Sequence, residues 1–303
     1  MDTRIILFAA GVLMMAACSS NDPEVQDSAG EIHLYTEVTA PTRAEDDPTD
    51  LQDAQFIRNT EISVMVTDKA TENRVPYNLE TYRANGSGGL TPTTPQYYPP
   101  SGSNVDICAY HPAGTTNTFT VAANQQSPDD YRASDLMWAQ LTDINKNTDA
   151  ADRVLKFNHL CSKIIVKLIK GNGVTSAEIN AASITLEGGG EYNQLIMGGT
   201  FGAGQGSLTA DANNWGTMTI TTNAGTAYHA AVVIPQNMNG KKITVALGGG
   251  SQSYTISDTT FEPGTRYTYT ITVNKGELVV SATIEPWTNA WDEDHTPKPT
   301  LKI

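Results

Sequence analysis

Short stretches in which apolar and polar residues alternate recur along the chain and predict β-strands. Residues 31–38 (EIHLYTEV) place Ile32, Leu34 and Val38 on one face, with Thr36 in the same row. A period of two is that of a strand buried on one side. Comparable runs stand at residues 62–67, 105–110, 154–170, 228–234, 242–247, 267–273 and 278–284. The pattern predicts no long amphipathic helix.

Turn-forming residues separate these runs at short intervals. Glycine-rich segments at residues 84–89, 186–191 and 247–251 are typical of hairpin connections. Many short strands with frequent turns predict an all-β fold of two tandem antiparallel β-sandwich domains. A polar stretch near residue 150 divides them, so we expect an N-terminal domain over 31–150 and a C-terminal domain over 151–287. Residues 288–303 form a polar tail.

The start of the chain has the pattern of an export signal. Residues 5–17 are all apolar or small, a length typical of a signal peptide and too short to cross a bilayer. Residues 15–18 (MAAC) resemble a bacterial lipobox, with Met15 where Leu is usual. We therefore predict a lipoprotein signal peptide over 1–17, lipid attachment at Cys18 and a flexible tether over 18–30. An ordinary secretory peptide with a chance cysteine is the alternative.

Net charge limits the partners that the chain can bind, and the cysteine content bears on whether it contains a disulfide. The net charge of −14 argues against nucleic acid as a partner. Once Cys18 carries lipid, Cys108 and Cys161 remain. They could form a disulfide in an oxidising compartment or stay as small buried hydrophobes, and spacing alone does not decide between these states.

Candidate chemistry is sparse. The five histidines stand singly, and neither the CxxC nor the HExxH spacing occurs. The glycine-rich run at residues 198–206 lacks the Lys-Ser/Thr of a phosphate-binding loop. We predict no enzyme activity, no metal site and no cofactor. Tyr97, Tyr98 and the four tryptophans could form a sugar-stacking face or lie in the core.

Four stretches together resemble the fimbrillin family of Bacteroides-type bacteria, the lipoprotein-exported subunits of type V pili. Their order and spacing carry the resemblance more than any single motif. They are the lipobox at Cys18, Thr42-Arg43-Ala44 after the first strand, residues 96–112 (QYYPPSGSNVDICAYHP), and residues 157–164 (FNHLCSKI) together with 267–273 (YTYTITV) and 284–287 (IEPW). The resemblance implies that both sandwich domains are transthyretin-like.

The resemblance also implies an assembly route. The acylated Cys18 would hold the precursor in the outer membrane, and an Arg-specific surface protease would cut after Arg43, so that the mature chain begins at Ala44. Loss of the strand at residues 31–38 would open a groove, which the C-terminal strand of another subunit would fill. Residues 39–50 (TAPTRAEDDPTD) are Pro-rich and acidic, so they suit an exposed cleavage segment.

The last alternating run fits the donor role that this route requires. It presents Leu278, Val280, Ala282 and Ile284 on one face, a ladder similar to that of the strand that would be lost. The alternative is an ordinary last strand of its own domain. Pro297 and Pro299 in the tail cannot extend a ladder, which leaves the end of the donor segment open.

The predicted function is that of a structural and adhesive subunit of a cell-surface fimbria. Its partners would be other pilin subunits, the processing protease and a host glycan or protein receptor. If Arg43 is not cut, the chain would be an anchor subunit that keeps its lipid. A rival from another class is a surface lipoprotein that binds glycans through Tyr97, Tyr98 or a tryptophan.

Overall fold

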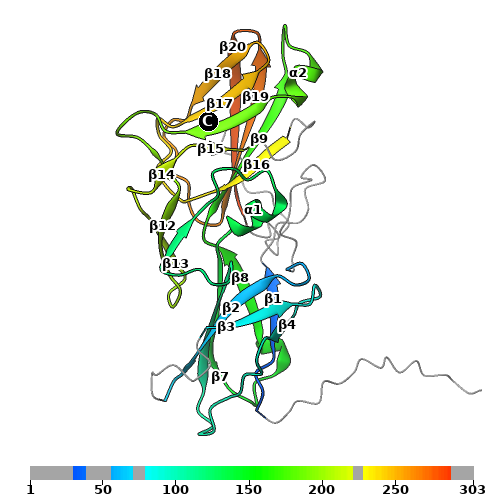
Figure 1. Cartoon of the computed structure of the whole chain (residues 1–303), viewed down its shortest axis with the longest axis vertical. Helices are drawn as coiled ribbons and strands as arrows, with labels where there is room; N and C mark the ends of the chain where they lie inside the picture. Colours follow the sequence, from blue (N-terminus) through cyan, green and yellow to red (C-terminus); the bar gives the residue numbers. More distant parts are fainter. Residues whose placement is uncertain (1–29, 39–55, 71–78, 221–227, 288–303) are drawn as a thin grey trace, which may run out of the picture.

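The computed structural model describes residues 30–38, 56–70, 79–220 and 228–287, and β-strands dominate it (Figure 1). The N-terminal strands form a closed barrel in the order β1-β4-β3-β2-β5-β7-β8. Its strands are β1 (Leu34–Val38), β2 (Glu61–Asp68), β3 (Glu80–Ala84), β4 (Gly89–Pro92), β5 (Val105–His111), β7 (Met137–Ile144) and β8 (Val154–His159).

Two four-stranded sheets form the main part of the C-terminal half, in the orders β15-β10-β17-β18 and β16-β9-β19-β20. The first contains β10 (Ser183–Glu187), β15 (Met218–Thr219), β17 (Lys242–Leu247) and β18 (Gly250–Thr255). The second contains β9 (Ser162–Lys170), β16 (Tyr228–Val233), β19 (Thr265–Asn274) and β20 (Glu277–Pro286).

Smaller elements accompany these sheets and the barrel. The sheet β13-β12-β6 joins β6 (Thr118–Thr120) to β12 (Gly198–Gly202) and β13 (Ser207–Ala210), and β11 (Leu195–Ile196) pairs with β14 (Trp215–Gly216). Two short α-helices are α1 (Pro128–Ala133) and α2 (Ser176–Asn180), and a 3-10 turn covers Ala150–Asp152. Neither α-helix has the length and hydropathy that crossing a membrane would require.

Strand formation follows the predicted alternation closely in places. In β19 every second side chain from Tyr267 to Val273 is buried, and the side chains between them are half-buried. Burying every second side chain is what a strand with one covered face does. The buried residues form two hydrophobic clusters, one inside the barrel and one between the C-terminal sheets.

The all-β prediction is confirmed, but the predicted antiparallel pairing does not hold throughout. β1 pairs in parallel with β8, and β9 pairs in parallel with β19. The N-terminal strands also close into a barrel instead of leaving the open edges of a sandwich. Alternation identifies a strand and its buried face, but it carries no information on the direction of the neighbouring strand.

The domain limits and the transthyretin-like likeness stay predictions. β8 follows the predicted division at residue 150, yet it pairs with β1 and β7 of the barrel. Both remaining cysteines are buried thiols and do not form a disulfide. Burial raises the pKa of the Cys161 thiol, so this side chain behaves as a small hydrophobe.

Candidate functional site: the first strand and the C-terminal strand

β1 closes the barrel by joining β4 to β8. Its residues pair antiparallel with β4 at Leu34↔Leu90 and in parallel with β8 from Tyr35↔Val154 to Val38↔Phe157. The Thr36 N–H donates to the carbonyl of Gly88 at 2.7 Å. Removing β1 would therefore break two ladders and open the barrel along its length.

The side chains of the first strand alternate as the sequence suggests. Ile32 and Leu34 are 0% and 1% exposed in the barrel core, and Thr36 is buried as well. Tyr35 points outward and is 39% exposed. The side chain of Val38 lies outside the part that the structure describes. β1 therefore contributes an apolar ladder to a core that is otherwise built by residues 56–157.

β8 depends on β1 for most of its pairing. Residues 154–157 pair with β1, whereas β7 pairs only with Asn158 and His159 at the end of the strand. Leu155 and Phe157 are both fully buried in the barrel core. Among the described residues, the first four residues of β8 therefore form their strand pairing with β1.

β20 is an edge strand of the C-terminal sheet in this structure. It pairs with β19 from Thr265↔Pro286 to Asn274↔Glu277, and no strand in the described ranges pairs with its other edge. Leu278, Val280, Ala282 and Ile284 are half-buried and pack against the C-terminal core, while Val279 is exposed. The structure therefore holds the predicted donor segment as the last strand of its own sheet.

A buried aromatic and charged cluster fixes the end of β20. The indole of Trp287 is fully buried and stacks on the imidazole of His159, with 3.7 Å between ring centroids and 10° between planes. His159 Nδ1 lies 2.9 Å from both carboxylate oxygens of Asp135, and both side chains are 0% exposed. Lys163 Nζ lies 5.8 Å from the centre of the Trp287 ring and the same distance from the Tyr131 ring.

Sequence reasoning did not find this cluster. The residues come from the segment before β7, the end of β8, the start of β9, α1 and the residue after β20, so no local spacing connects them. The one available signal is Trp287, shortly after the alternating run, which the sequence places in a family pattern and, with the other tryptophans, in a possible sugar-stacking face or the core.

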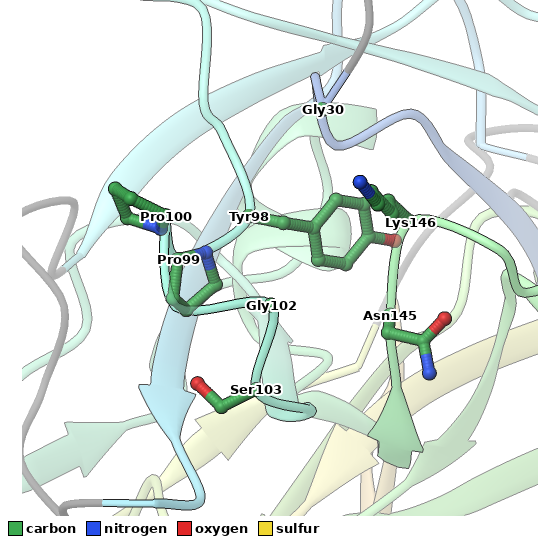
Figure 2. Close-up of a pocket in the computed structure, with 8 residues that line it drawn as sticks. All are labelled: Gly30, Tyr98, Pro99, Pro100, Gly102, Ser103, Asn145 and Lys146. Atoms are coloured by element: carbon green, nitrogen blue, oxygen red, sulfur yellow. The ribbon is translucent and has the colours of Figure 1, made fainter.

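A small cavity lies where the chain enters the first strand. It has a volume of about 160 Å³ and is lined by Gly30, Tyr98, Pro99, Pro100, Gly102, Ser103, Asn145 and Lys146. Figure 2 shows the Tyr98 ring pointing across it toward Lys146 and Asn145. The Tyr98 N–H donates to the carbonyl of Gly30 at 2.7 Å, which ties this wall to the first strand.

The aromatic residues proposed for sugar stacking are scattered. Tyr98 is buried and Trp287 is inside the cluster described above, whereas Tyr97 is 42% exposed and Trp215 is 57% exposed. Trp138 donates its indole N–H to the carbonyl of Ala203 at 2.6 Å. Among the described residues, no group of three or more His, Cys, Asp or Glu side chains is placed to hold a metal ion.

Other predicted residues lie outside the described residues. These are Cys18, Arg43, Ala44 and Trp291, together with the predicted tail at residues 288–303. The connection between β1 and β2 contains Arg43, because β1 ends at Val38 and β2 begins at Glu61.

Comparison with known proteins agrees with this architecture. The model of a family described as fimbrillin-like matches residues 42–287. A protein of Bacteroides uniformis assigned as a fimbrium subunit, Fim1C, is 24% identical over 301 residues, which cover 94% of each chain.

Solved structures share the fold. A protein of Bacteroides uniformis assigned to cell adhesion has a TM-score of 0.68 at 19% identity, over 87% of this chain and 100% of its own. A second such protein, from Bacteroides ovatus, has a TM-score of 0.67 at 18% identity, over 86% of this chain and 98% of its own. Because the family model matches most of the sequence, this chain belongs to the fimbrillin-like family, and the resemblance seen in the sequence is confirmed.

Proposed function

We propose that this chain is a structural and adhesive subunit of a cell-surface fimbria. Its membership of the fimbrillin-like family and its similarity to a fimbrium subunit support this function. In the proposed route the chain is exported as a lipoprotein, held in the outer membrane through acylated Cys18, and assembled after cleavage between Arg43 and Ala44.

The observation that carries the proposal is the position of β1. This strand and the residues just before it precede residue 42, where the family match begins, yet Leu34 of β1 and Ile32 ahead of it belong to the barrel core. A cut after Arg43 would therefore separate β1 from the barrel without breaking another strand. Its departure would leave β4 and β8 with unpaired edges and an open apolar groove, which favours binding of another strand.

β20 has the properties of a replacement strand. Leu278, Val280, Ala282 and Ile284 share one face, as the buried Leu34 and Thr36 do in β1. In its own sheet β20 pairs on one side, with β19, whereas in the groove of a neighbour it would pair with β4 and β8. Hydrogen bonds to two strands of the neighbour would favour transfer of β20 into its groove. Loss of the hydrogen bonds between β20 and β19 opposes this transfer.

The partners in this proposal are other pilin subunits and an Arg-specific surface protease. A host glycan or protein receptor would be bound by the assembled fimbria. Glycan binding by the monomer is less well supported, because Tyr98 is buried and the exposed aromatic residues Tyr97 and Trp215 lie on different elements.

The test compares two arginine variants expressed on the native cell surface. Wild-type protein stripped from cells is expected to begin at Ala44 and to run as a heat-sensitive ladder of oligomers on gels. Arg43→Lys should block an Arg-specific protease and leave an acylated monomer that begins at Cys18. Intact mass and N-terminal sequencing give the readout.

Arg58→Lys is the matched control, because Arg58 is the next arginine along the chain and is exposed. This variant should mature and assemble as the wild type does. A wild-type chain that still begins at acylated Cys18 and runs as a monomer would contradict assembly by strand exchange and would favour the anchor subunit.

A further inference from the structure

β8 contacts both of the strands that the proposed exchange uses. Its residues 154–157 pair with β1, and its last residue, His159, stacks on Trp287 at the end of β20. β1 and β20 themselves lie in different parts of the molecule, β1 in the barrel and β20 in the C-terminal sheets (Figure 1). β8 is therefore the element through which one strand can affect the other.

We propose that β8 couples the departure of β1 to the release of β20, so that a subunit becomes a donor once its own groove has opened. This inference rests on the proposed strand exchange and adds its regulation. While β1 is in place, β8 is held along its length and presents His159 to Trp287. Without β1, the pairing of β8 is reduced to Asn158 and His159 with β7.

The contact between His159 and Trp287 is sensitive to such a change. Two rings stacked at 3.7 Å and nearly parallel lose their contact when either ring tilts or shifts. Asp135, in the segment before β7, orients the imidazole, so His159 is held by that segment as well as by β8. Freedom gained by β8 would strain both contacts at once.

Two buried polar atoms of the cluster lack hydrogen-bond partners, and this suits a contact between His159 and Trp287 that must open. Trp287 Nε1 and His159 Nε2 have no hydrogen-bond partner among the described residues although both atoms are buried. A buried polar atom without a hydrogen-bond partner opposes burial, because it has lost its bonds to water. Docking of Trp287 therefore relies on stacking and on the backbone bond from the Trp287 N–H to the carbonyl of Gly264.

Trp287 follows the end of β20 that lies away from the hairpin with β19, and release would begin there. The other end of the strand is joined to β19 by a tight turn between Asn274 and Glu277. A strand fixed at a hairpin opens from its far end, so undocking of Trp287 would precede separation of the ladder from Thr265↔Pro286 inward.

Hydrogen exchange measured by mass spectrometry tests the coupling in the uncut chain, kept uncut by Arg43→Lys. Leu34→Asp places a charge in the barrel core and should expel β1. We expect faster exchange at residues 31–38 and, through β8, an increase of about tenfold at residues 277–287. Tyr35→Asp adds the same charge at an exposed neighbouring position and should change neither region.

Two further variants separate coupling from general loss of stability. Val64→Ala weakens the same barrel core from β2, which pairs with β3 and β5, and should leave residues 277–287 at the wild-type rate. His159→Ala should raise exchange at residues 277–287 with β1 still in place, and it keeps the test available if Leu34→Asp does not fold.

The coupling is overturned if Leu34→Asp speeds exchange at residues 31–38 alone, or if Val64→Ala acts on residues 277–287 as strongly as Leu34→Asp. It is also overturned if His159→Ala leaves residues 277–287 unchanged. Strand exchange is judged separately, by the Ala44 start and the oligomer ladder. Oligomers together with uncoupled exchange rates would refute the coupling and leave the proposed function standing.

Discussion

A single buried residue can make the stability of a protein depend on pH, and His229 is such a residue here. It lies in β16 opposite Val166 and is fully buried. Neither ring nitrogen has a hydrogen-bond partner among the described residues. Burial lowers the pKa of His229 from 6.5 to about 4, because the charged imidazolium cannot be solvated there. His229 is therefore neutral in the folded protein at neutral pH.

The first prediction concerns the stability of the protein between pH 7 and pH 4. In the unfolded chain His229 binds a proton near pH 6.5, whereas in the folded chain it does so only near pH 4. The unfolded state therefore gains protons first as the pH falls, and the free energy of unfolding decreases by roughly 3 kcal/mol through this residue. Above pH 6.5 the residue imposes no such penalty.

Urea unfolding at pH 7 and pH 4.5 measures this effect. His229→Phe removes the titrating group and should lose less stability than the wild type over the same interval. An equal loss in the two proteins would show that His229 remains solvated or finds a partner when protonated.

At the scale of elements, the sequence predicts strands better than it predicts their neighbours. The run at residues 154–170 reads as one β-rich segment, but the structure divides it at residues 160 and 161 into β8, in the barrel, and β9, in the C-terminal sheet. Hydrophobic character is the same on both sides of this division, so periodicity cannot locate it. The parallel pairing of β1 with β8 is hidden for a similar reason, because a strand with one apolar face can pair with many others.

The candidate site shows the same limit. The apolar faces of β1 and β20 could be derived from alternation, since the local period fixes which side chains share a face. The cluster around Trp287 could not, because Asp135, His159 and Lys163 meet only when the barrel packs against the C-terminal sheets. Contacts between distant elements depend on tertiary packing, and no motif encodes them.

One strand edge is protected by a side chain. The amide of Gln125 pairs with Val232 in β16, donating from Nε2 to the carbonyl and accepting from the N–H, both at 2.8 Å. These are the bonds that a neighbouring strand would make. Gln125 is buried, so the edge of β16 is closed to water and to other strands at this point.

The second prediction follows from this edge contact. Gln125→Ala leaves the buried N–H and carbonyl of Val232 without the amide, and we expect a loss of about 1–3 kcal/mol in the free energy of unfolding. Gln126→Ala removes the same side chain at the exposed neighbouring position and should change stability by less than about 0.5 kcal/mol. Chemical denaturation of both variants gives the comparison, and equal losses would refute a specific role for Gln125.

At the scale of the whole molecule, the barrel and the C-terminal sheets meet through the residues that hold β20. His159 belongs to β8 of the barrel, whereas Trp287 follows β20 and Lys163 lies in β9. A contact between two parts stabilises each part through the other, and the coupling free energy is the same in both directions. If loss of β1 favours release of β20, release of β20 must favour loss of β1.

The third prediction tests this reciprocity in the uncut chain carrying Arg43→Lys. Trp287→Ala removes the stacked ring and should lower the free energy of unfolding by about 3–5 kcal/mol, the usual cost of deleting a buried aromatic side chain. Because β8 loses the stacking contact of His159 with Trp287, hydrogen exchange at residues 31–38, of which 35–38 pair with β8, should also become faster. Trp215→Ala is the control, since Trp215 is 57% exposed and should affect neither stability nor β1. Unchanged exchange at residues 31–38 in a folded Trp287→Ala protein would mean that β8 holds β1 independently of β20, and the two strands would then act separately in assembly.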